Sequence, residues 1–454
     1  MKRVVLVWPF DHCHSPSLSL LYQAKILNGS YDVSVVYSNQ LFSSDNLSLP
    51  LEVQEEPERS LKKVASVVAK LDPDYVCIGS YRQHTPFIDR FAKQFRMQHD
   101  AALIATGYVP TFSPEEMLSL TPEIEFILRG ESERSLKNLL DSLSKSQSQS
   151  EVKGLSMKKD GVFHHNPTDR IEDLDSLPLF DFEDIVGNRP KRIDIRSSLG
   201  CIMDCRFCGL HKMWPRPVRY HSEDYVLRQI KHLDSLYSME FVHFIDEMFL
   251  CNVKRAESLA QAIHRNFPYL KWGCMFRNDT VSESVASLLK DSGLVNAAVG
   301  VESNNPKVLQ FLQKTKSPSS YLAGINKNID MLKEKLEFLE LGFITGTPVE
   351  TASDILSLIE FVQDIKNDRK ELKDLRIALG RLVIYAGSDL YSRIGQFNMV
   401  KDEMRYSAYQ KFFEAGYDRL FWAVPWNYLA ENKNFRSHAD YMEILSKAFE
   451  AART

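Results

Sequence analysis

Short apolar runs alternate with amphipathic segments over residues 1–142 of the chain. The apolar runs are typical of buried strands, and segments between them, such as 62–71 and 87–98, have the apolar periodicity of helices. Alternation of this kind predicts an α/β first domain built on a doubly wound parallel sheet. Its five predicted strands lie in the sequences RVVLVWP, YDVSVVYS, DYVCIGS, AALIATG and EFILRGE.

The predicted strands of this domain end in small or polar residues, among them Gly79, Ser80, Gly107 and Gly130. The carboxyl ends of parallel strands meet at one edge, where open α/β sheets bind ligands. We therefore expect a ligand at this edge of a Rossmann-like domain. A G-x-G-x-x-G motif does not follow the first strand, which disfavours a dinucleotide as that ligand.

A polar stretch, SLSKSQSQSE at 142–151, follows the first domain and is typical of a linker or mobile loop. After it, the Asp160-Gly161 pair predicts the turn of a small β-hairpin. An extended connector with several prolines leads on from the hairpin. We assign 143–188 to this linker and hairpin.

Strands and helices alternate again from residue 189, with helices expected at 222–236, 254–266, 282–292, 321–336 and 353–365. Six βα units without a seventh and eighth predict an open, partial (β/α)6 barrel at 189–388. Residues 389–454 predict a helical, aromatic-rich cap on this barrel, with a wall facing the substrate as the alternative. The six strands lie in RIDIRSS, FVHFID, KWGCMF, AAVGVE, EFLELGFITG and RIALGRLVI.

Composition narrows the class of protein, since 44% hydrophobic and 26% charged residues are typical of a soluble globular chain. A net charge of -4 argues against nucleic acid as a partner and favours a small-molecule or peptide substrate. The first apolar run ends at Pro9, too early for a signal peptide. No run approaches the roughly 20 apolar residues of a membrane span, so we expect a cytoplasmic protein.

Three of the seven cysteines, Cys201, Cys205 and Cys208, fall within eight residues on a loop that follows a predicted strand. Thiolates are the preferred ligands of iron-sulfur clusters, and three of them leave one iron of a four-iron cluster open. His211 could instead complete a zinc site, which the spacing leaves open. We expect the remaining cysteines to pack as small apolar side chains: Cys13, Cys77, Cys251 and Cys274.

The C-x-x-x-C-x-x-C spacing, with Phe207 before the last cysteine, resembles the radical S-adenosylmethionine (SAM) superfamily. The later segments FIDEMF, GVES and GFITGTPVE resemble the same superfamily in the same order, and RLVIYAGSDLY resembles the segment that closes its core. The resemblance implies a 4Fe-4S cluster on the three cysteines, with SAM on the open iron and reductive cleavage to a 5′-deoxyadenosyl radical. It also implies contacts with SAM from Phe207, Asp246, Glu247, Arg277, Glu302, Ser303, Gly342, Ile344 and Gly346.

The first domain, through PDYVCIGS, ATGYVPTFSPEEML and EFILRGESERSLKNLL, resembles the cobalamin-binding domain that precedes many radical SAM barrels. The Asp-x-His-x-x-Gly loop of other cobalamin proteins is absent. DHCHSPS at 11–17, with His12 and His14, has its residue types but not its spacing. Cobalamin would then lack a histidine ligand, and a domain that has lost cobalamin is the alternative. The resemblance implies corrin contacts from Gly79, Ser80, Tyr81, Arg82, His84, Gly107, Tyr108, Val109, Gly130 and Glu131.

These resemblances together imply a cobalamin-dependent radical SAM enzyme, most often a methyltransferase acting on an unactivated carbon of a small molecule. They also imply an external electron donor such as flavodoxin or ferredoxin. A second cysteine triplet is absent, which disfavours a methylthiotransferase. Two alternatives stay open: a non-methylating rearrangement or cyclisation with the same cofactors, and a non-catalytic zinc-binding protein.

Overall fold

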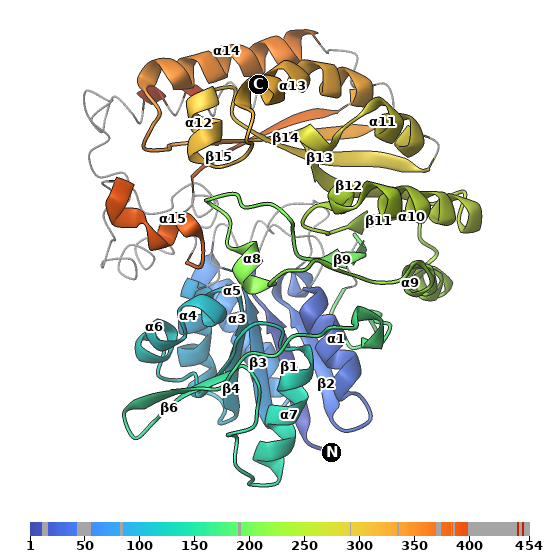
Figure 1. Cartoon of the computed structure of the whole chain (residues 1–454). Coiled ribbons are helices and arrows are strands. Elements are labelled where there is room, and N and C mark those ends of the chain that lie inside the picture. The colour runs from blue at the N-terminus through green and yellow to red at the C-terminus, as the bar shows by residue number, and fades with distance from the viewer. Residues whose placement is uncertain are drawn as a thin grey trace. The chain divides into compact units, whose positions relative to one another are not determined.

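The computed structural model describes residues 1–10, 17–42, 56–81, 85–188, 192–290, 292–333, 336–368, 374–382, 384, 386–397, 443–444 and 447–448. The described chain forms two compact units (Figure 1). The first takes in the residues up to Ile193 together with 228–237 of one helix. The second contains most of the remaining described residues, and each unit has its own sheet.

The first unit contains a seven-stranded sheet in the order β2-β1-β3-β4-β5-β6-β7. Its first five strands run parallel, which confirms the predicted doubly wound sheet. They are β1 (Arg3–Trp8), β2 (Asp32–Tyr37), β3 (Tyr75–Ser80), β4 (Ala102–Gly107) and β5 (Phe126–Leu128). The helices are α1 (Leu18–Leu27), α3 (Pro57–Lys70), α4 (Thr85–Arg96), α5 (Tyr108–Phe112), α6 (Pro114–Leu120) and α7 (Glu133–Ser144).

Strand β1 shows why its apolar run contains no polar position. Val5 and Val7 pack into a core with α3 and α4, whereas Leu6 and Trp8 pack into a second core with α1 and α7. Side chains of a strand alternate between the two faces of the sheet, so helices on both faces require apolar residues throughout. The sheet is therefore covered on both sides.

The predicted hairpin is present as β6 (Leu155–Lys159) and β7 (Val162–His165), and its turn residues Asp160 and Gly161 both have positive φ. It does not stand apart as a connector, because β6 pairs antiparallel with β5 and extends the first sheet. The polar stretch before it is also tied down. Helix α7 runs on to Ser144, and Asn166 Nδ2 donates to the carbonyl of Gln149 at 2.9 Å.

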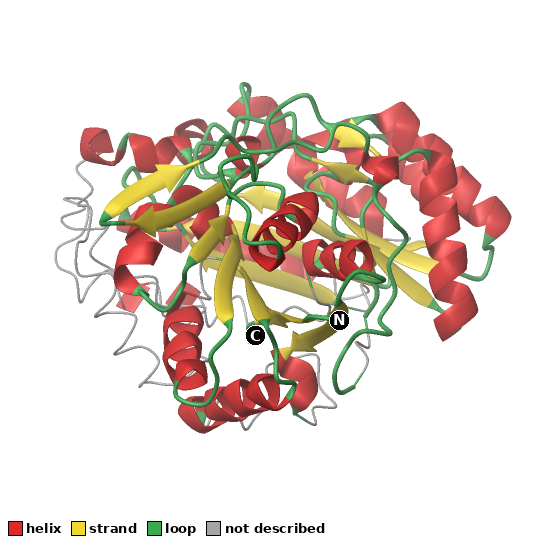
Figure 2. Ribbon diagram, turned by 90° about the horizontal axis from the view of Figure 1, so that it is seen from below, coloured by secondary structure: helices red, strands yellow, loops and turns green. Residues whose placement is uncertain are grey.

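The second unit contains a six-stranded parallel sheet in the order β15-β14-β13-β12-β11-β8, which confirms the open partial barrel. Helices flank the strands of both sheets (Figure 2). The strands are β8 (Asp194–Ile195), β11 (Phe241–Phe244), β12 (Lys271–Arg277), β13 (Leu294–Glu302), β14 (Phe338–Thr345) and β15 (Leu375–Arg381). The helices are α8 (Leu210–Met213), α10 (Val253–Asn266), α11 (Glu283–Lys290), α12 (Pro306–Phe311), α13 (Pro318–Lys333), α14 (Ala352–Asp368) and α15 (Asp389–Ser392), together with α9 (Glu223–Tyr237), whose residues 228–237 are assigned to the first unit.

A short antiparallel pair, β9 (Ser198–Leu199) with β10 (Arg219–Tyr220), accompanies the second sheet and was not predicted. Short 3-10 helices include η4 (Phe249–Cys251) and η5 (Asn278–Thr280). The predicted C-terminal cap begins with α15, but its aromatic residues from Phe412 to Tyr428 lie outside the described residues. No helix in the described part of the chain is long and apolar enough to cross a membrane.

The two faces of the second sheet differ in exposure. Along β13 and β14, the buried side chains alternate with half-exposed ones such as Ala298, Gly300, Gly342 and Ile344. One face is therefore packed and the other is open. The segments that resemble SAM-binding motifs lie at the carboxyl end of this sheet, with Gly342 and Ile344 on its open face.

Candidate cluster and cofactor sites

The three cysteines lie on the loop between β9 and α8, and all three side chains are half-buried. The loop is fixed from two sides. The amide of Arg206 donates to the carbonyl of Leu312 at 2.8 Å, and the amide of Leu390 donates to the carbonyl of Arg206 at 2.9 Å. Inside the loop, the Cys208 amide donates to the Cys205 carbonyl at 3.0 Å. The thiols are thus presented from an anchored backbone.

The acidic segment after β11 accepts hydrogen bonds from the residues that directly precede the cysteine loop. The Asp246 carboxylate is fully buried and accepts hydrogen bonds from the Ser197 amide at 2.9 Å, from Ser197 Oγ at 2.8 Å and from Ser198 Oγ. Glu247 Oε2 accepts from the Gly200 amide at 3.0 Å, beside Cys201. Desolvation raises the pKa of Glu247 to about 7. Both carboxylates orient the cysteine loop, and their contact with SAM stays a prediction.

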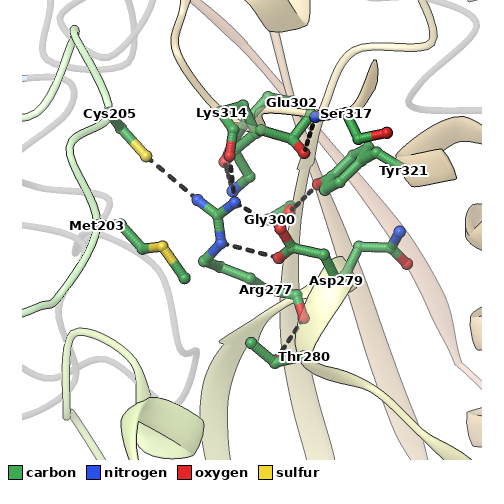
Figure 3. Close-up of polar contacts among 12 residues, drawn as sticks. Met203, Cys205, Arg277, Asp279, Thr280, Gly300, Glu302, Lys314, Ser317 and Tyr321 are labelled. Carbon is green, nitrogen blue, oxygen red and sulfur yellow. Dashed lines mark hydrogen bonds and ion pairs between the residues drawn. The ribbon is translucent and has the colours of Figure 1, made fainter. Parts of the chain in front are cut away.

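Arg277, at the end of β12, lies between Cys205 and Asp279 (Figure 3). Its Nη1 donates to Cys205 Sγ at 3.3 Å, and Nε and Nη2 donate to the Asp279 carboxylate at 2.9 and 2.8 Å. Nη2 also donates to the Lys314 carbonyl. Burial lowers the pKa of Arg277, but Asp279 outweighs burial and the net shift is upward. The guanidinium is therefore charged and held against a cysteine sulfur.

Glu302 lies on a β-bulge at the end of β13. The register with β14 shifts between Gly300 and Glu302, and Glu302 has φ of 71°. The bulge aims its carboxylate at Lys314, whose Nζ donates to Oε1 at 2.7 Å. A Cβ at Gly300 would lie 2.7 Å from that same oxygen, so a larger residue there would require the ends of the Glu302 and Lys314 side chains to shift.

Cys251 differs from the expectation of simple apolar packing. It ends η4 and lies beside Cys201, and a hydrogen bond between the two thiols lowers the pKa of Cys201 to about 6. The Ile202 amide also donates to the Cys251 sulfur. Cys77 and Cys274 are fully buried, as expected, and Cys13 lies outside the described residues. Strands β8 and β11 are neighbours, so the loops that follow them, which carry Cys201 and Cys251, lie next to each other. The adjacency of these two strands is the signal from which the contact between the two cysteines could have been predicted.

The remaining predicted SAM residues surround the same end of the sheet. Phe207 and Ile344 pack against one apolar cluster that includes Leu312 and Leu390. Gly342 pairs in register with Gly300 and Ala378, and a Cβ built on it would meet nothing closer than 3.8 Å. A methyl group would therefore fit at this point of β14 in ordinary van der Waals contact.

The turn after β14 is held by a buried carboxylate. Gly346 has φ of 84°, and Glu350 accepts from the Thr347 amide at 2.5 Å and from Thr347 Oγ1 at 2.8 Å. Burial raises the pKa of Glu350 to about 7. Ser303 is also buried, and its hydroxyl accepts from the Asn305 amide at 3.0 Å. These contacts shape the predicted adenine-binding segment from within.

In the first unit, the predicted corrin residues gather at the carboxyl edge of the sheet, but its glycines have reasons within the fold. A Cβ at Gly79 would lie 2.8 Å from the Trp8 ring. Gly107 has φ of 105°, and a Cβ there would lie 2.2 Å from the Ser80 carbonyl oxygen. Gly130 also has positive φ, at 72°. Close strand contacts and turns therefore account for these glycines without a ligand.

Polar side chains at this edge of the sheet also form hydrogen bonds within the protein. Ser80 Oγ donates to the Thr106 carbonyl at 3.1 Å, and Glu131 accepts from the Ile171 amide at 2.8 Å. Tyr108 packs edge-on against Phe112, and Val109 is half-buried against the core. Tyr81 is different, since it is 41% exposed and stands edge-on to Trp8. Several predicted residues lie outside the described ones: Arg82, His84, His12 and His14.

The cysteine loop fits an iron-sulfur cluster by its donor set and its surroundings. Three half-buried thiols share one loop, and cluster irons are each held by a thiolate. Burial raises the pKa of Cys205, while the charges of Lys314 and Arg277 oppose that effect and favour the thiolate. Among the residues that the structure describes, no three His, Cys, Asp or Glu side chains are grouped to hold a single metal ion, His211 included.

Comparison with known proteins gives related sequences across both units. An uncharacterised methyltransferase of Pyrococcus horikoshii is 27% identical over 367 residues, which is 78% of this chain and 74% of the relative. An anaerobic magnesium-protoporphyrin IX monomethyl ester cyclase of Cereibacter sphaeroides is 25% identical over 324 residues. That match covers 68% of this chain and 52% of the cyclase.

A solved structure shares the fold of both units. It is the radical SAM methyltransferase TsrM of Kitasatospora setae, described with cobalamin and a 4Fe-4S cluster bound. The TM-score is 0.68 at 15% identity, over 87% of this chain and 75% of TsrM. The model of the radical SAM superfamily matches residues 195–362, which include the three cysteines, Arg277, Glu302 and Gly342. Residues 195–362 therefore form a radical SAM domain.

Proposed function

We propose that the chain is a cobalamin-dependent radical SAM methyltransferase that methylates an unactivated carbon of a small molecule. One observation carries the proposal: three half-buried thiols on an anchored loop, with the cations Arg277 and Lys314 beside Cys205. The methyltransferase name of the Pyrococcus horikoshii relative supports it. So does the likeness in fold to TsrM, which is described with both cofactors bound.

In this proposal Cys201, Cys205 and Cys208 hold a 4Fe-4S cluster. A cluster with one open iron binds SAM and supplies the electron that cleaves it to a 5′-deoxyadenosyl radical. Asp246 and Glu247 keep the loop in place through Ser197, Ser198 and Gly200, as their hydrogen bonds indicate. The chain's task at this site is to hold three thiolates in one fixed arrangement.

The open end of the second sheet would receive SAM. Glu302, aimed by its bulge, would accept hydrogen bonds from the ribose or the amine of SAM. The adenine would lie against Gly342, which has no side chain, with Ile344 and Phe207 as apolar walls. Gly346 and Ser303 would shape the backbone around it. Apolar walls also exclude water from a radical.

Cobalamin would bind at the carboxyl edge of the first sheet. Tyr81, exposed at the end of β3, offers an aromatic ring to a planar macrocycle. Ser80, Gly107 and Gly130 lie at the same edge and would provide backbone contacts. We further propose an external electron donor such as flavodoxin or ferredoxin and a cytoplasmic location.

Anaerobic reconstitution with iron, sulfide and hydroxocobalamin tests both cofactors. We expect about four irons and about one cobalt per chain, and 5′-deoxyadenosine after addition of SAM and dithionite. Cys205→Ala should lose the cluster and the SAM cleavage, whereas Cys77→Ala, a buried cysteine in the first unit, should keep both. Retention of about four irons by Cys205→Ala would contradict the assignment.

A second candidate is a radical cyclisation or rearrangement with the same cofactors, which the match to the magnesium-protoporphyrin cyclase favours. The two candidates differ in the fate of the SAM methyl group. Methylation of reduced cobalamin by SAM releases S-adenosylhomocysteine even without substrate. S-adenosylhomocysteine together with 5′-deoxyadenosine supports the methyltransferase, and 5′-deoxyadenosine alone supports the cyclisation.

A further inference from the structure

Arg277 is a buried, charged side chain that contacts one of the three cysteines. It is 6% exposed, and its contacts run to Asp279, to the Lys314 carbonyl and to Cys205. We propose that Arg277 is a positioning residue of the cluster, which donates a hydrogen bond to the Cys205 thiolate and raises the cluster's reduction potential. The inference rests on the proposed function, because it requires Cys205 to be a cluster ligand.

The contact between the Arg277 guanidinium and Asp279 determines where the donor nitrogen Nη1 points. Nε and Nη2 form a two-point contact with the Asp279 carboxylate at 2.9 and 2.8 Å. A guanidinium is planar and rigid, so two fixed nitrogens also fix the third. Nη1 therefore points at Cys205 Sγ, 3.3 Å away (Figure 3).

Asp279 is brought to Arg277 by a local turn. The 3-10 helix η5 begins directly after Arg277, and Thr280 Oγ1 donates to the Arg277 carbonyl at 2.7 Å. The turn returns the Asp279 side chain to the guanidinium two residues earlier. Arg277 is thus held in place by residues that directly follow its own strand.

The Lys314 carbonyl, the other acceptor of Arg277, is also fixed. The Lys314 amide donates to the Leu309 carbonyl at 3.0 Å, at the end of α12. In the same segment, the Leu312 carbonyl accepts a hydrogen bond from the amide of Arg206, the residue that directly follows Cys205. One short segment therefore positions both the cysteine loop and the arginine that faces it.

Charge balance explains the sign of the expected effect. Arg277 is neutralised by Asp279, and Lys314 is neutralised by Glu302, so the site presents a directed N–H group rather than a large net charge. Reduction adds negative charge to the cluster and its thiolates, and a hydrogen bond to sulfur strengthens as that charge grows. Arg277 therefore stabilises the reduced form more than the oxidised form, which makes the cluster easier to reduce.

This role differs from the contact with SAM that the resemblance implies for Arg277. Two nitrogens of the guanidinium are committed to Asp279, and the third already faces a cluster ligand. The loss of Arg277 should consequently change the cluster before SAM is added. That difference makes the role measurable without substrate and without turnover.

The test uses the reconstituted full-length enzyme and the variants Arg277→Lys, Arg277→Gln and Asp279→Asn. Arg96→Lys is the matched control, since Arg96 is a part-buried arginine of the first unit that pairs with the Asp100 carboxylate and donates to the Glu123 carbonyl. Iron content, the electron paramagnetic resonance signal and the midpoint potential of the cluster are measured without SAM. We expect the midpoint to become more negative in both Arg277 variants, to shift less in Asp279→Asn, and to stay unchanged in Arg96→Lys.

A direct readout avoids dependence on the variants. Electron-nuclear double resonance on the reduced wild-type enzyme, grown with arginine labelled with ¹⁵N only in the guanidinium group, should show a nitrogen coupled to the cluster, and Arg277→Lys should remove that coupling. Should the Arg277 variants fail to take up iron, the wild-type spectrum decides. No arginine coupling in the wild type, or midpoints equal to wild type in every cluster-bearing Arg277 variant, would overturn the inference.

The same experiment separates this inference from the proposed function. A wild-type enzyme that binds no cluster would remove the proposed function and with it any role for Arg277. A wild-type enzyme that binds about four irons and cleaves SAM, but shows neither the coupling nor the shifts, would leave the proposed function and exclude the role of Arg277.

Discussion

Glycines at the carboxyl ends of strands in the two sheets, Gly107 and Gly342, have different surroundings. In the first sheet, Gly79 and Gly107 are required by contacts inside the fold, because an added Cβ would lie 2.8 Å from Trp8 or 2.2 Å from the Ser80 carbonyl. In the second sheet, a Cβ added to Gly342 would make only ordinary van der Waals contacts, the nearest with the Val299 carbonyl oxygen at 3.8 Å. A glycine at a carboxyl edge is therefore evidence for a ligand only where the fold itself would accept a side chain.

The comparison predicts its largest effect at Gly107. Alanine there would have to adopt φ of 105° and would meet a backbone oxygen, so we expect Gly107→Ala to lower the free energy of unfolding by about 4 kcal/mol. Gly161→Ala is the control, because Gly161 has φ of 79° but open space around it. Urea unfolding measures both, and equal losses would show that backbone strain alone is responsible.

The ion pair between Glu302 and Lys314 should give the next largest effect. Glu302→Gln leaves a lysine that is 4% exposed without its carboxylate, and we expect a loss of about 3 kcal/mol in stability together with loss of SAM binding. Glu302→Gln with Lys314→Met should recover much of the stability but not the SAM binding. Recovery of both would mean that Glu302 has no contact with SAM.

Glu350 predicts a dependence on pH. Its pKa is raised to about 7, so the protonated form stabilises the fold, and that stabilisation is lost as pH rises from the ordinary value through 7. Glu350→Gln should therefore gain about 2 kcal/mol relative to wild type between pH 5 and pH 8. Thermal unfolding of both proteins across that range measures it. A difference that is constant with pH would place the carboxylate pKa near its ordinary value.

Gly342 gives the smallest effect in free energy and the sharpest contrast with Gly107. Valine suits a strand and its Cβ would meet no atom closer than 3.8 Å, so Gly342→Val should leave the thermal midpoint within a few degrees of wild type. If the adenine of SAM lies against Gly342, SAM affinity should fall about tenfold, or about 1.4 kcal/mol. Equilibrium binding of SAM to the reconstituted enzyme measures this. Unchanged affinity would place the adenine elsewhere.

Much of the fold could be predicted from the sequence, because long apolar runs and helical periodicity extend over whole elements. All five parallel strands of the first sheet and all six of the second were expected. The pair β9 and β10 escaped prediction, since two residues are too few to show a period. The attachment of β6 to β5 also escaped, because edge pairing depends on which strand end lies nearby.

The site was predictable only in its local part. The cysteines are close in sequence and have a diagnostic spacing, whereas Lys314, Asp279 and Cys251 acquire their roles through contacts made by folding. Lys314 follows Glu302 by twelve residues and has no motif of its own. The hydrogen bond from Arg277 to Cys205 spans 72 residues, a separation at which sequence pattern carries no information on distance.

The central claim, that the three cysteines hold a cluster whose open iron binds SAM, has one most direct test. Electron-nuclear double resonance of the reduced, reconstituted wild-type enzyme would be recorded with SAM labelled with ¹⁵N at its amino group. The account predicts a strong coupling between that nitrogen and the cluster, as expected for direct ligation of iron. A cluster that forms and is reduced but shows no coupling to the labelled SAM would contradict the account.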